Sequence, residues 1–194
     1  ILVSPSESKI LKSLLISLDI KYLYAPRIIH SIYLDNKNFD SFYLSEEGVV
    51  PRKKIRIRSY PKTTNKNLFF EQKQTSNDGR FKQSEQIDSN KAKKILKIGY
   101  QDKDLGLVKP IIEVRYLRQY FSFRNLRITF DQNIKYMSYK KIYMFAPELF
   151  NVVEIKYEKI KDLHDVSFLD TYPRERFSKY CRGIINSKVH INEF

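Results

Sequence analysis

Charged and polar residues recur at every second position in several stretches of the chain. The stretch KKIRIRSY (53–60) alternates with period two. Arg56 and Arg58 share one face of a predicted strand, and the isoleucines that precede them share the other. Arginine suits bidentate binding of phosphate, whereas lysine acts as a point charge. Three further stretches each place polar or charged residues on one face: Tyr116 and Arg118 in EVRYLR (113–118), Arg127, Thr129 and Asp131 in LRITFD (126–131), and Glu154 and Lys156 in VVEIKY (152–157).

Glutamates are interspersed among these basic residues, as in FFEQK (69–73) and in VVEIKY. A carboxylate next to bound phosphates is repulsive unless a divalent cation lies between them, and Mg²⁺ is commonly held by one or two carboxylates plus substrate phosphates. The pattern therefore favours a metal–triphosphate site over a plain solvated face. We interpret Glu71 as a structural ion-pair partner of Lys73 or of a neighbouring arginine.

Two architectures fit such strands. An open sheet packs its apolar face on helices and leaves the charged face in water. A barrel of about eight strands can instead turn the charged faces inward and form a cationic tunnel. The residues alone do not decide between the two arrangements.

The charge balance points to a polyanionic partner. The chain of 194 residues has 36 Lys and Arg against 22 Asp and Glu, a formal net charge of +14. Such an excess is typical of proteins that bind nucleic acid, an anionic membrane or a phosphorylated small molecule. The hydrophobic content of 42% is sufficient for a folded core.

Cysteine usage and hydropathy bear on the compartment. Cys181 is the only cysteine, so no internal disulfide can form and nothing marks an oxidising compartment. No apolar stretch approaches the ~20 residues that span a bilayer, and no signal peptide is visible. We expect a cytoplasmic location, with membrane association through a partner as the alternative.

Three helices are predicted, over residues 4–18, 89–99 and 174–187. The first has a capping box in which Ser4 is the cap and Glu7 completes the motif. The second begins at Ser89 or Asn90 and ends at Gly99.

The remaining segments predict strands and turns. The polar segment 36–50 is interpreted as turns with aromatic anchors, and the chain as one α+β domain or a barrel with attached helices. The predicted strands are 31–35, 53–60, 68–74, 80–86, 111–118, 119–123, 126–131 and 151–157.

An ordered set of segments over roughly residues 31–185 resembles the VTC domain, the polyphosphate polymerase domain of the vacuolar transporter chaperone complex, which also has bacterial relatives. That family belongs to the triphosphate tunnel metalloenzyme (CYTH-like) superfamily. The resemblance implies an α+β fold, an antiparallel β-barrel with covering helices, over residues 1–194. The segments are SIYLDNKNFDSFYLSEEG, RKKIRIRSY, FFEQKQ, YLRQYF, LRITFDQNI, VVEIKY and FSKYCRGI.

The resemblance also implies roles for individual residues. Glu154 matches the metal-binding glutamate, for Mn²⁺ or Mg²⁺. We predict that the charged faces enclose one lumen that contains these groups. The residues implied to bind phosphate and act in catalysis are Arg56, Arg58, Lys73, Arg118 and Arg127. Further implied substrate contacts are Lys82, Tyr116, Lys156 and Lys179.

The chain departs from the family pattern at its beginning. The family opens with a strand carrying an E-x-K-Y-like motif before its first helix, whereas this sequence opens with ILVSPSE. We therefore expect that the charged residues of this motif are missing or precede Ile1, and that the single domain lacks its first strand.

Three functions remain open from the sequence. The first is a polyphosphate polymerase-like phosphotransferase that moves the γ-phosphate of ATP onto a polyphosphate chain. The second is a metal-dependent tunnel triphosphatase, and the third is a non-enzymatic module that binds polyphosphate or another polyanion. Nucleic acid is not the expected partner, because single-stranded binders display stacking aromatics. Here only Tyr60, Tyr116 and Tyr120 have the right parity.

Overall fold

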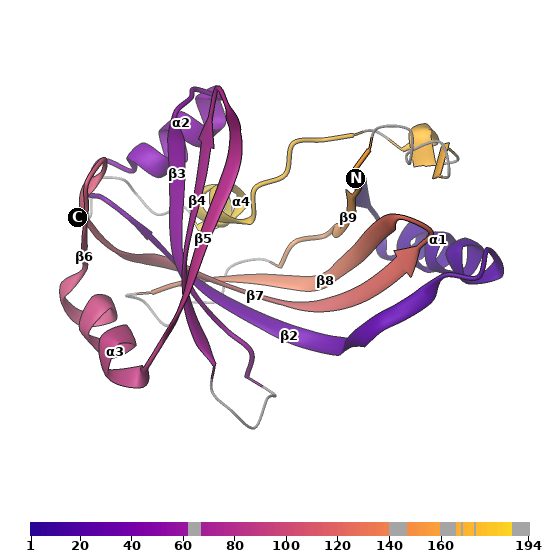
Figure 1. Ribbon diagram of the computed structural model, residues 1–194, viewed down its shortest axis with the longest axis horizontal. Coiled ribbons are helices and arrows are strands. Elements are labelled where there is room, and N and C mark those ends of the chain that lie inside the picture. Colours follow the sequence, from indigo (N-terminus) through magenta and orange to yellow (C-terminus); the bar gives the residue numbers. More distant parts are fainter. Residues whose placement is uncertain (62–66, 140–146, 160–165, 168, 173, 188–194) are drawn as a thin grey trace. The chain divides into compact units, whose positions relative to one another are not determined.

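The computed structural model describes residues 1–61, 67–139, 147–159, 166–167, 169–172 and 174–187 (Figure 1). The chain divides into two compact units. Unit 1 comprises residues 1–28, 116–134 and 147–177. Unit 2 comprises residues 29–115, 135–146 and 178–194.

The described residues form an α+β structure, which confirms the predicted class. The strand order is β1-β9-β8-β7-β2-β3-β4-β5, with β6 paired to β7. The antiparallel pairs are β1–β9, β8–β9, β2–β3, β3–β4, β4–β5 and β6–β7. The strands are β1 (Leu2–Val3), β2 (Lys21–Asp35), β3 (Arg52–Ser59), β4 (Leu68–Ser76), β5 (Gly79–Ile87), β6 (Tyr100–Asp102), β7 (Gly106–Phe123), β8 (Leu126–Ser138) and β9 (Asn151–Lys156). The helices are α1 (Pro5–Ser17), α2 (Asp40–Glu47), α3 (Ser89–Ile98) and α4 (Lys179–Ser187).

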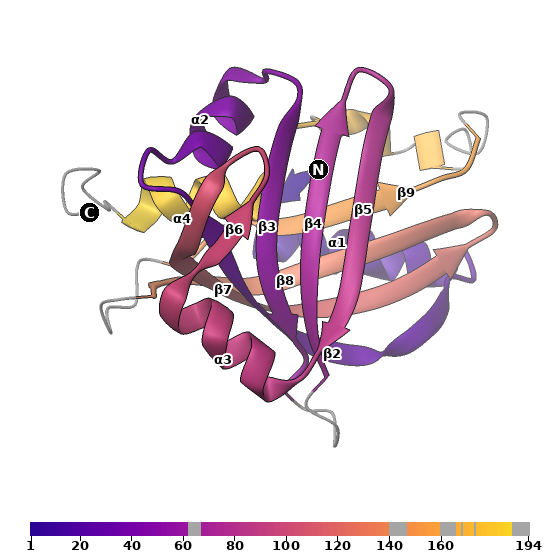
Figure 2. The same ribbon diagram turned by 60° about the vertical axis from the view of Figure 1, so that its left-hand side comes forward.

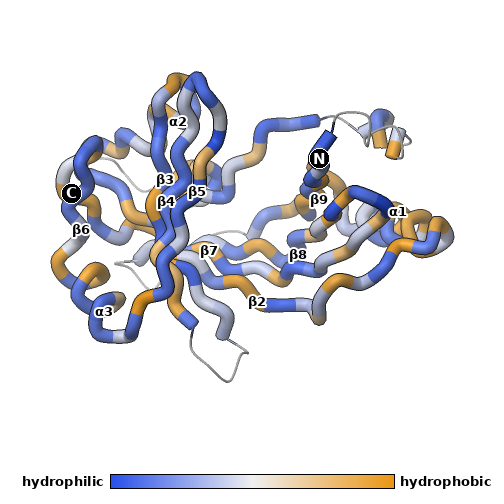
Figure 3. The backbone as a smooth tube through the Cα atoms, viewed as in Figure 1, coloured by the Kyte–Doolittle hydropathy of each residue, from blue (hydrophilic) through white to orange (hydrophobic). Residues whose placement is uncertain are grey.

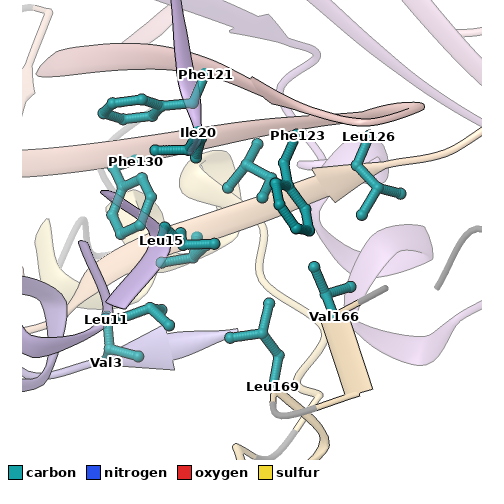
Figure 4. Close-up of a cluster of buried hydrophobic side chains, with 12 residues drawn as sticks. Val3, Leu11, Leu15, Ile20, Phe121, Phe123, Leu126, Phe130, Val166 and Leu169 are labelled. Atoms are coloured by element: carbon teal, nitrogen blue, oxygen red, sulfur yellow. The ribbon is translucent and has the colours of Figure 1, made fainter. Parts of the chain in front are cut away.

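Unit 1 has a hydrophobic core between α1 and the strands β7 to β9 (Figure 4). Leu11 and Leu15 of α1 are buried against Phe121 and Phe130. The predicted capping box is confirmed, because Ser4 Oγ accepts from the Glu7 backbone N–H at 3.2 Å while Glu7 Oε2 accepts from the Ser4 N–H at 2.7 Å. The apolar sides of the strands are thus covered, and their other sides are left for the charged residues.

Unit 2 has a separate core in which α3 covers the long strands β3 and β4 (Figure 2). Ile55 and Ile57 are buried in this core, as the period-two pattern of β3 predicts. Lys53, also buried, reaches Asp102 at 2.9 Å and so ties β3 to β6. In β3 hydrophobic and hydrophilic residues alternate from Ile55 to Arg58, and both kinds occur along the strands drawn in Figure 3.

Several strands differ from the prediction. Strands β1 and β6 are absent from it, β7 begins at Gly106 instead of residue 111, and β8 continues to Ser138 instead of ending at residue 131. Strand β2 begins at Lys21, ten residues before the predicted start at Ser31. Its residues 21–27 are all exposed and show no alternation, so their extended conformation depends on hydrogen bonding to the neighbouring strand. The predicted strands 111–118 and 119–123 are one continuous strand, β7.

The helix predictions need three corrections. Segment 36–50 contains α2, which follows Phe39 in the left-handed conformation (φ 58°). The cap of α3 is Asp88, whose side chain accepts from the Lys91 N–H, rather than Ser89 or Asn90. The last helix begins at Lys179, so residues 174–178 lie outside it.

None of the helices within the described ranges combines the length and apolar character that a membrane crossing requires.

Candidate phosphate-binding site

One face of strands β2 to β5, which we call the basic face of unit 2, carries Arg56 and Arg58. The strand register places Tyr33 opposite Arg56, Arg56 opposite Glu71, and Ser31 opposite Arg58. Directly opposite residues lie on the same side of a sheet. Arg56 and Arg58 are only 6% and 8% exposed, so a plain solvated face is excluded for this strand.

Glu71 is the carboxylate at the centre of this face. Its Oε2 lies 2.5 Å from Arg56 Nη2 and 3.7 Å from Arg58 Nη1, and its Oε1 lies 2.5 Å from Lys82 Nζ. Burial alone raises the pKa of Glu71, but the charges of the two arginines and the hydrogen bonds from Lys82 and Arg56 lower it to about 2. Glu71 is therefore an ionised internal counter-ion, in agreement with its predicted structural role.

Three lysines occupy adjacent register positions on the same face. Lys54 lies opposite Lys73, and Lys73 lies opposite Lys82. Like charges directly opposite each other destabilise a sheet, so this row is suited to an anionic ligand that lies across the strands. Lys54 Nζ also donates to Ser178 Oγ at 2.9 Å.

Tyr33 brings a phenol into the middle of the basic face of unit 2. Its hydroxyl accepts from Arg56 Nη1 at 2.9 Å, and its ring stacks on Tyr180 with the centroids 5.3 Å apart. Burial raises the pKa of Tyr33, but the positive charges of Arg56, Arg58 and Lys73 outweigh burial and lower the pKa to about 8. Deprotonation of Tyr33 places a second anion beside Arg56.

Phosphate binding to this face is expected to weaken as the pH rises through about 8, because the Tyr33 phenolate then competes with the ligand for Arg56. The Tyr33→Phe variant should lack this component. The measurement is the affinity for inorganic triphosphate, by calorimetry at pH values on both sides of 8. Because triphosphate itself titrates, the prediction concerns the difference between the two proteins. Identical pH profiles for wild type and variant would contradict it.

Helix α4 is attached to the end of β2 beside Tyr33. Tyr180 donates its hydroxyl hydrogen to Asp35 Oδ2 at 2.5 Å, and Asp35 also accepts two backbone N–H groups of α2. Lys179, a predicted substrate contact, is the first residue of α4 and is half-buried. The same contacts that hold Tyr180 against Tyr33 therefore also position Lys179.

The second group of predicted residues lies on one side of strands β7 to β9, the basic face of unit 1. In the β8–β9 register, Thr129 lies opposite Glu154 and Arg127 lies opposite Lys156. The intervening apolar residues of both strands point to the opposite side, where Phe130 and Val153 are buried in the core of unit 1. The predicted division of β8 and β9 into a charged and an apolar face is confirmed.

Arg118 is held firmly on the basic face of unit 1. Its Nε lies 2.5 Å from Asp131 Oδ1 and its Nη2 lies 2.6 Å from Asp131 Oδ2, which is a bidentate pair with a fully buried carboxylate. The guanidinium also lies 5.4 Å from the ring centroid of the buried Tyr116. Burial lowers the pKa of Arg118, but the bonds to Asp131 and the charges of Asp131 and Glu154 raise it well above its ordinary value.

Glu154 has a looser environment than Asp131. Its side chain is 42% exposed, with Oε2 3.5 Å from Arg118 Nη2 and Oε1 3.6 Å from Lys156 Nζ. Lys156 is half-exposed, and Arg127 across the register is exposed. Glu154 therefore lies among cations without being buried by them.

A divalent cation is implied by the family resemblance, and the carboxylates of the two basic faces differ in their ability to hold one. Within the described residues no group of three or more His, Cys, Asp and Glu side chains is placed to bind a metal. Asp131 forms a short bidentate pair with Arg118, and Glu71 lies 2.5 Å from both Arg56 and Lys82, whereas the cations beside Glu154 are 3.5 and 3.6 Å away. Glu154 fits as a single protein ligand, with substrate phosphates supplying further oxygens.

Several residues of these faces were not predicted as site residues. Lys54 continues the two-residue spacing of Arg56 and Arg58, so the alternation of the strand alone places it on the same face. Tyr33 and Asp131 also have the correct parity, but only the strand register shows that they contact Arg56 and Arg118.

The predicted residues fall into two groups. Unit 2 contains Arg56, Arg58, Lys73, Lys82 and Lys179, whereas unit 1 contains Tyr116, Arg118, Arg127, Glu154 and Lys156. That both groups of residues line one lumen stays a prediction.

The strands carry arginines, lysines and a few carboxylates on one face and an apolar core on the other, as expected for a triphosphate tunnel (CYTH-like) protein. Several solved structures have a similar fold. A proposed adenylate cyclase from Bacillus halodurans is 16% identical, with a TM-score of 0.61 and 90% of each chain covered. The protein PH1819 from Pyrococcus horikoshii is 15% identical, with a TM-score of 0.52 and coverage of 93% of this chain and 94% of that chain.

A proposed adenylate cyclase from Vibrio parahaemolyticus is 12% identical, with a TM-score of 0.51 and 88% of each chain covered. Comparison with curated protein sequences gives no match. The model of the VTC domain family matches residues 7–187, and the chain belongs to this family.

Proposed function

We propose that this chain is a metal-dependent phosphotransferase of the polyphosphate polymerase type, which moves the γ-phosphate of ATP onto a polyphosphate chain. The observation that carries the proposal is the burial of Arg56 and Arg58 on a face that also holds a row of three lysines. A protein does not bury two arginines beside a row of lysines for solubility, because each buried cation must be compensated by an anion. Membership of the VTC domain family supports the same ligand class.

The chemistry asks little covalent work of the protein. Phosphoryl transfer is accelerated mainly by positioning and by neutralisation of charge on the phosphoryl oxygens. No nucleophilic side chain is required, because a terminal phosphate of the acceptor chain attacks. In the proposal the two basic faces line one tunnel. The phosphate-binding cations are Arg56, Arg58, Lys73, Lys82 and Lys179 from unit 2 and Arg118, Arg127 and Lys156 from unit 1.

Two further groups support these contacts. Tyr116 lies under the Arg118 guanidinium and limits its orientation. Glu154 is the residue that would hold Mn²⁺ or Mg²⁺, which when bound neutralises phosphate charge.

The function is tested by incubating the protein with ATP and Mn²⁺ and analysing the products. Long-chain polyphosphate is the expected result. Release of free phosphate without chain growth would instead identify a tunnel triphosphatase. Metal-independent binding of polyanions with a steep salt dependence and no product would identify a binding module.

Arg58→Ala is expected to weaken triphosphate binding by roughly 1.5–3 kcal/mol, the range for a hydrogen bond to a charged group. Arg58 is preferred to Arg56 for this test because its contact with Glu71 is longer, 3.7 Å from Nη1 against 2.5 Å from Arg56 Nη2, so its removal disturbs the counter-ion Glu71 less. Affinity for inorganic triphosphate is measured by calorimetry. The control is Lys93→Ala, which removes the same charge from the exposed side of α3. Equal affinities for the two variants would refute the assignment.

Glu154→Gln is expected to retain triphosphate binding but to lose metal-dependent turnover. Glutamine keeps the size of the side chain and removes the charge that attracts a divalent cation. The rival interpretation is a plain ion pair with Arg118, which predicts no change in metal requirement. Turnover is measured as a function of Mn²⁺ concentration. Normal turnover of the variant at limiting Mn²⁺ would show that Glu154 is not the ligand.

A further inference from the structure

A buried hydroxyl on the basic face of unit 1 lacks a hydrogen-bond partner. Thr129 is 1% exposed, and no other group in the described part of the chain accepts from or donates to its Oγ1. A buried polar group in this condition costs free energy, because it has lost its bonds to water without replacement. Threonine also does not pack better than valine, which has the same shape. Packing therefore gives no reason for a hydroxyl at this position.

The strand register shows which group lies nearest to this hydroxyl across the sheet. Thr129 is the direct partner of Glu154 in the β8–β9 pairing. Directly opposite residues of antiparallel strands have Cβ atoms about 4.5–5.5 Å apart. At this separation the carboxylate of a glutamate can turn to within hydrogen-bond distance of the opposite hydroxyl. Thr129 is thus placed beside Glu154, the carboxylate of the two basic faces that best fits a cation among the described residues.

Glu154 lies at a distance from its two cationic neighbours. Its ion pairs to Arg118 at 3.5 Å and to Lys156 at 3.6 Å are both longer than a typical charge-assisted hydrogen bond, and its side chain is 42% exposed. Asp131, by contrast, is locked by two short bonds to Arg118. A carboxylate that holds a divalent cation needs a second-shell donor to fix its orientation, and such donors strongly affect metal affinity.

We propose that Thr129 is a positioning residue for Glu154: its hydroxyl donates to the Glu154 carboxylate when Glu154 turns from Arg118 and Lys156 to a divalent cation. This inference rests on the proposed function, and it adds a group that orients the metal ligand. Because the hydroxyl is buried, it acts through Glu154 and does not itself contact substrate. The side chain therefore carries a folding cost that is recovered when the metal binds.

The test uses Thr129→Val, which removes the hydroxyl and keeps the shape, and Thr129→Ser, which keeps the hydroxyl. The melting temperature of each metal-free protein is measured first. Mn²⁺ is then titrated into protein preloaded with inorganic triphosphate, and free Mn²⁺ is followed by electron paramagnetic resonance. The chelation of Mn²⁺ by triphosphate alone is measured separately and subtracted.

Thr129→Val should melt about 2–4 °C above the wild type and bind Mn²⁺ roughly 10–100-fold more weakly, whereas Thr129→Ser should bind Mn²⁺ like the wild type. A purely structural threonine cannot give higher stability together with weaker metal binding. Unchanged Mn²⁺ affinity in Thr129→Val, or a lowered melting temperature, would overturn the inference and leave the proposed function intact. Absence of protein-dependent Mn²⁺ binding in the wild type would overturn both.

Discussion

Replacement of Glu71 by glutamine is expected to lower the free energy of unfolding by about 3–5 kcal/mol, the usual cost of removing one partner from a buried ion pair. Glu71 is 3% exposed and compensates Arg56, Arg58 and Lys82. A carboxyl whose pKa falls from 4.5 to about 2 contributes roughly 3 kcal/mol at neutral pH, which agrees with this range. Urea unfolding followed by circular dichroism measures the loss.

Inorganic triphosphate should restore much of the stability of the Glu71→Gln variant. The three cations that lose their counter-ion then bind the added anion more tightly, and a ligand that binds only the folded state stabilises it. The unfolding curves are therefore recorded with and without triphosphate for both proteins. A smaller stabilisation of the variant than of the wild type by triphosphate would contradict this part of the prediction.

Glu85→Gln is the matched control, because Glu85 of β5 forms an exposed ion pair with Lys91 of α3. Such a pair contributes ~0–1 kcal/mol. In the wild type, the contribution of Glu71 is complete above its unfolded pKa of 4.5 and is lost as the pH falls through its folded pKa of about 2. Similar unfolding energies for the two variants would show that Glu71 is not a buried counter-ion.

The second large effect is expected for Asp131→Asn in unit 1. Arg118 loses a bidentate partner while it remains largely buried, so the free energy of unfolding should again fall by about 3–5 kcal/mol. Asparagine has nearly the same size, so the loss reports charge and hydrogen bonding and no cavity. Denaturant unfolding at neutral pH is the measurement.

Glu154→Gln is the control for this prediction, because it removes a carboxylate from the same guanidinium. Glu154 is 42% exposed and 3.5 Å from Arg118, so its loss should cost no more than ~1 kcal/mol. Asp131 is then the structural carboxylate and Glu154 the functional one. If Asp131→Asn were as stable as Glu154→Gln, this division of roles would be wrong.

The local pattern was sufficient for elements whose signals lie within a few residues. The capping box of α1 depends on Ser4 and Glu7, three residues apart, and β3 follows from its own alternation. The apolar and charged faces of β8 and β9 follow from parity in the same way. These features can be predicted without knowledge of tertiary contacts, because helix caps and strand pleats are properties of the adjacent backbone.

Elements supported from a distance were missed or shortened. The N-terminal turn of α2 is bonded by the side chains of Asn36, which accepts from the Asp40 N–H, and of Asp35, which accepts from the N–H groups of Ser41 and Phe42. The residue at the cap position, Phe39, makes no side-chain cap bond, so the usual cap signal is absent from the sequence. The first part of β2 is exposed and lacks alternation, and it is a strand because a neighbouring strand pairs with it. Hydrophobic periodicity cannot signal a strand that buries no face.

The candidate site likewise has features that the local sequence determines and features that depend on tertiary contacts. The sequence by itself determined that Arg56 and Arg58 share a face and that this face is chemically distinct from that of Ile55 and Ile57. Only the tertiary structure decided that the arginines are buried, since this depends on the β3–β4 register that brings Glu71 opposite Arg56. The physical reason is that a guanidinium leaves water only where a carboxylate compensates its charge, and that carboxylate comes from another strand.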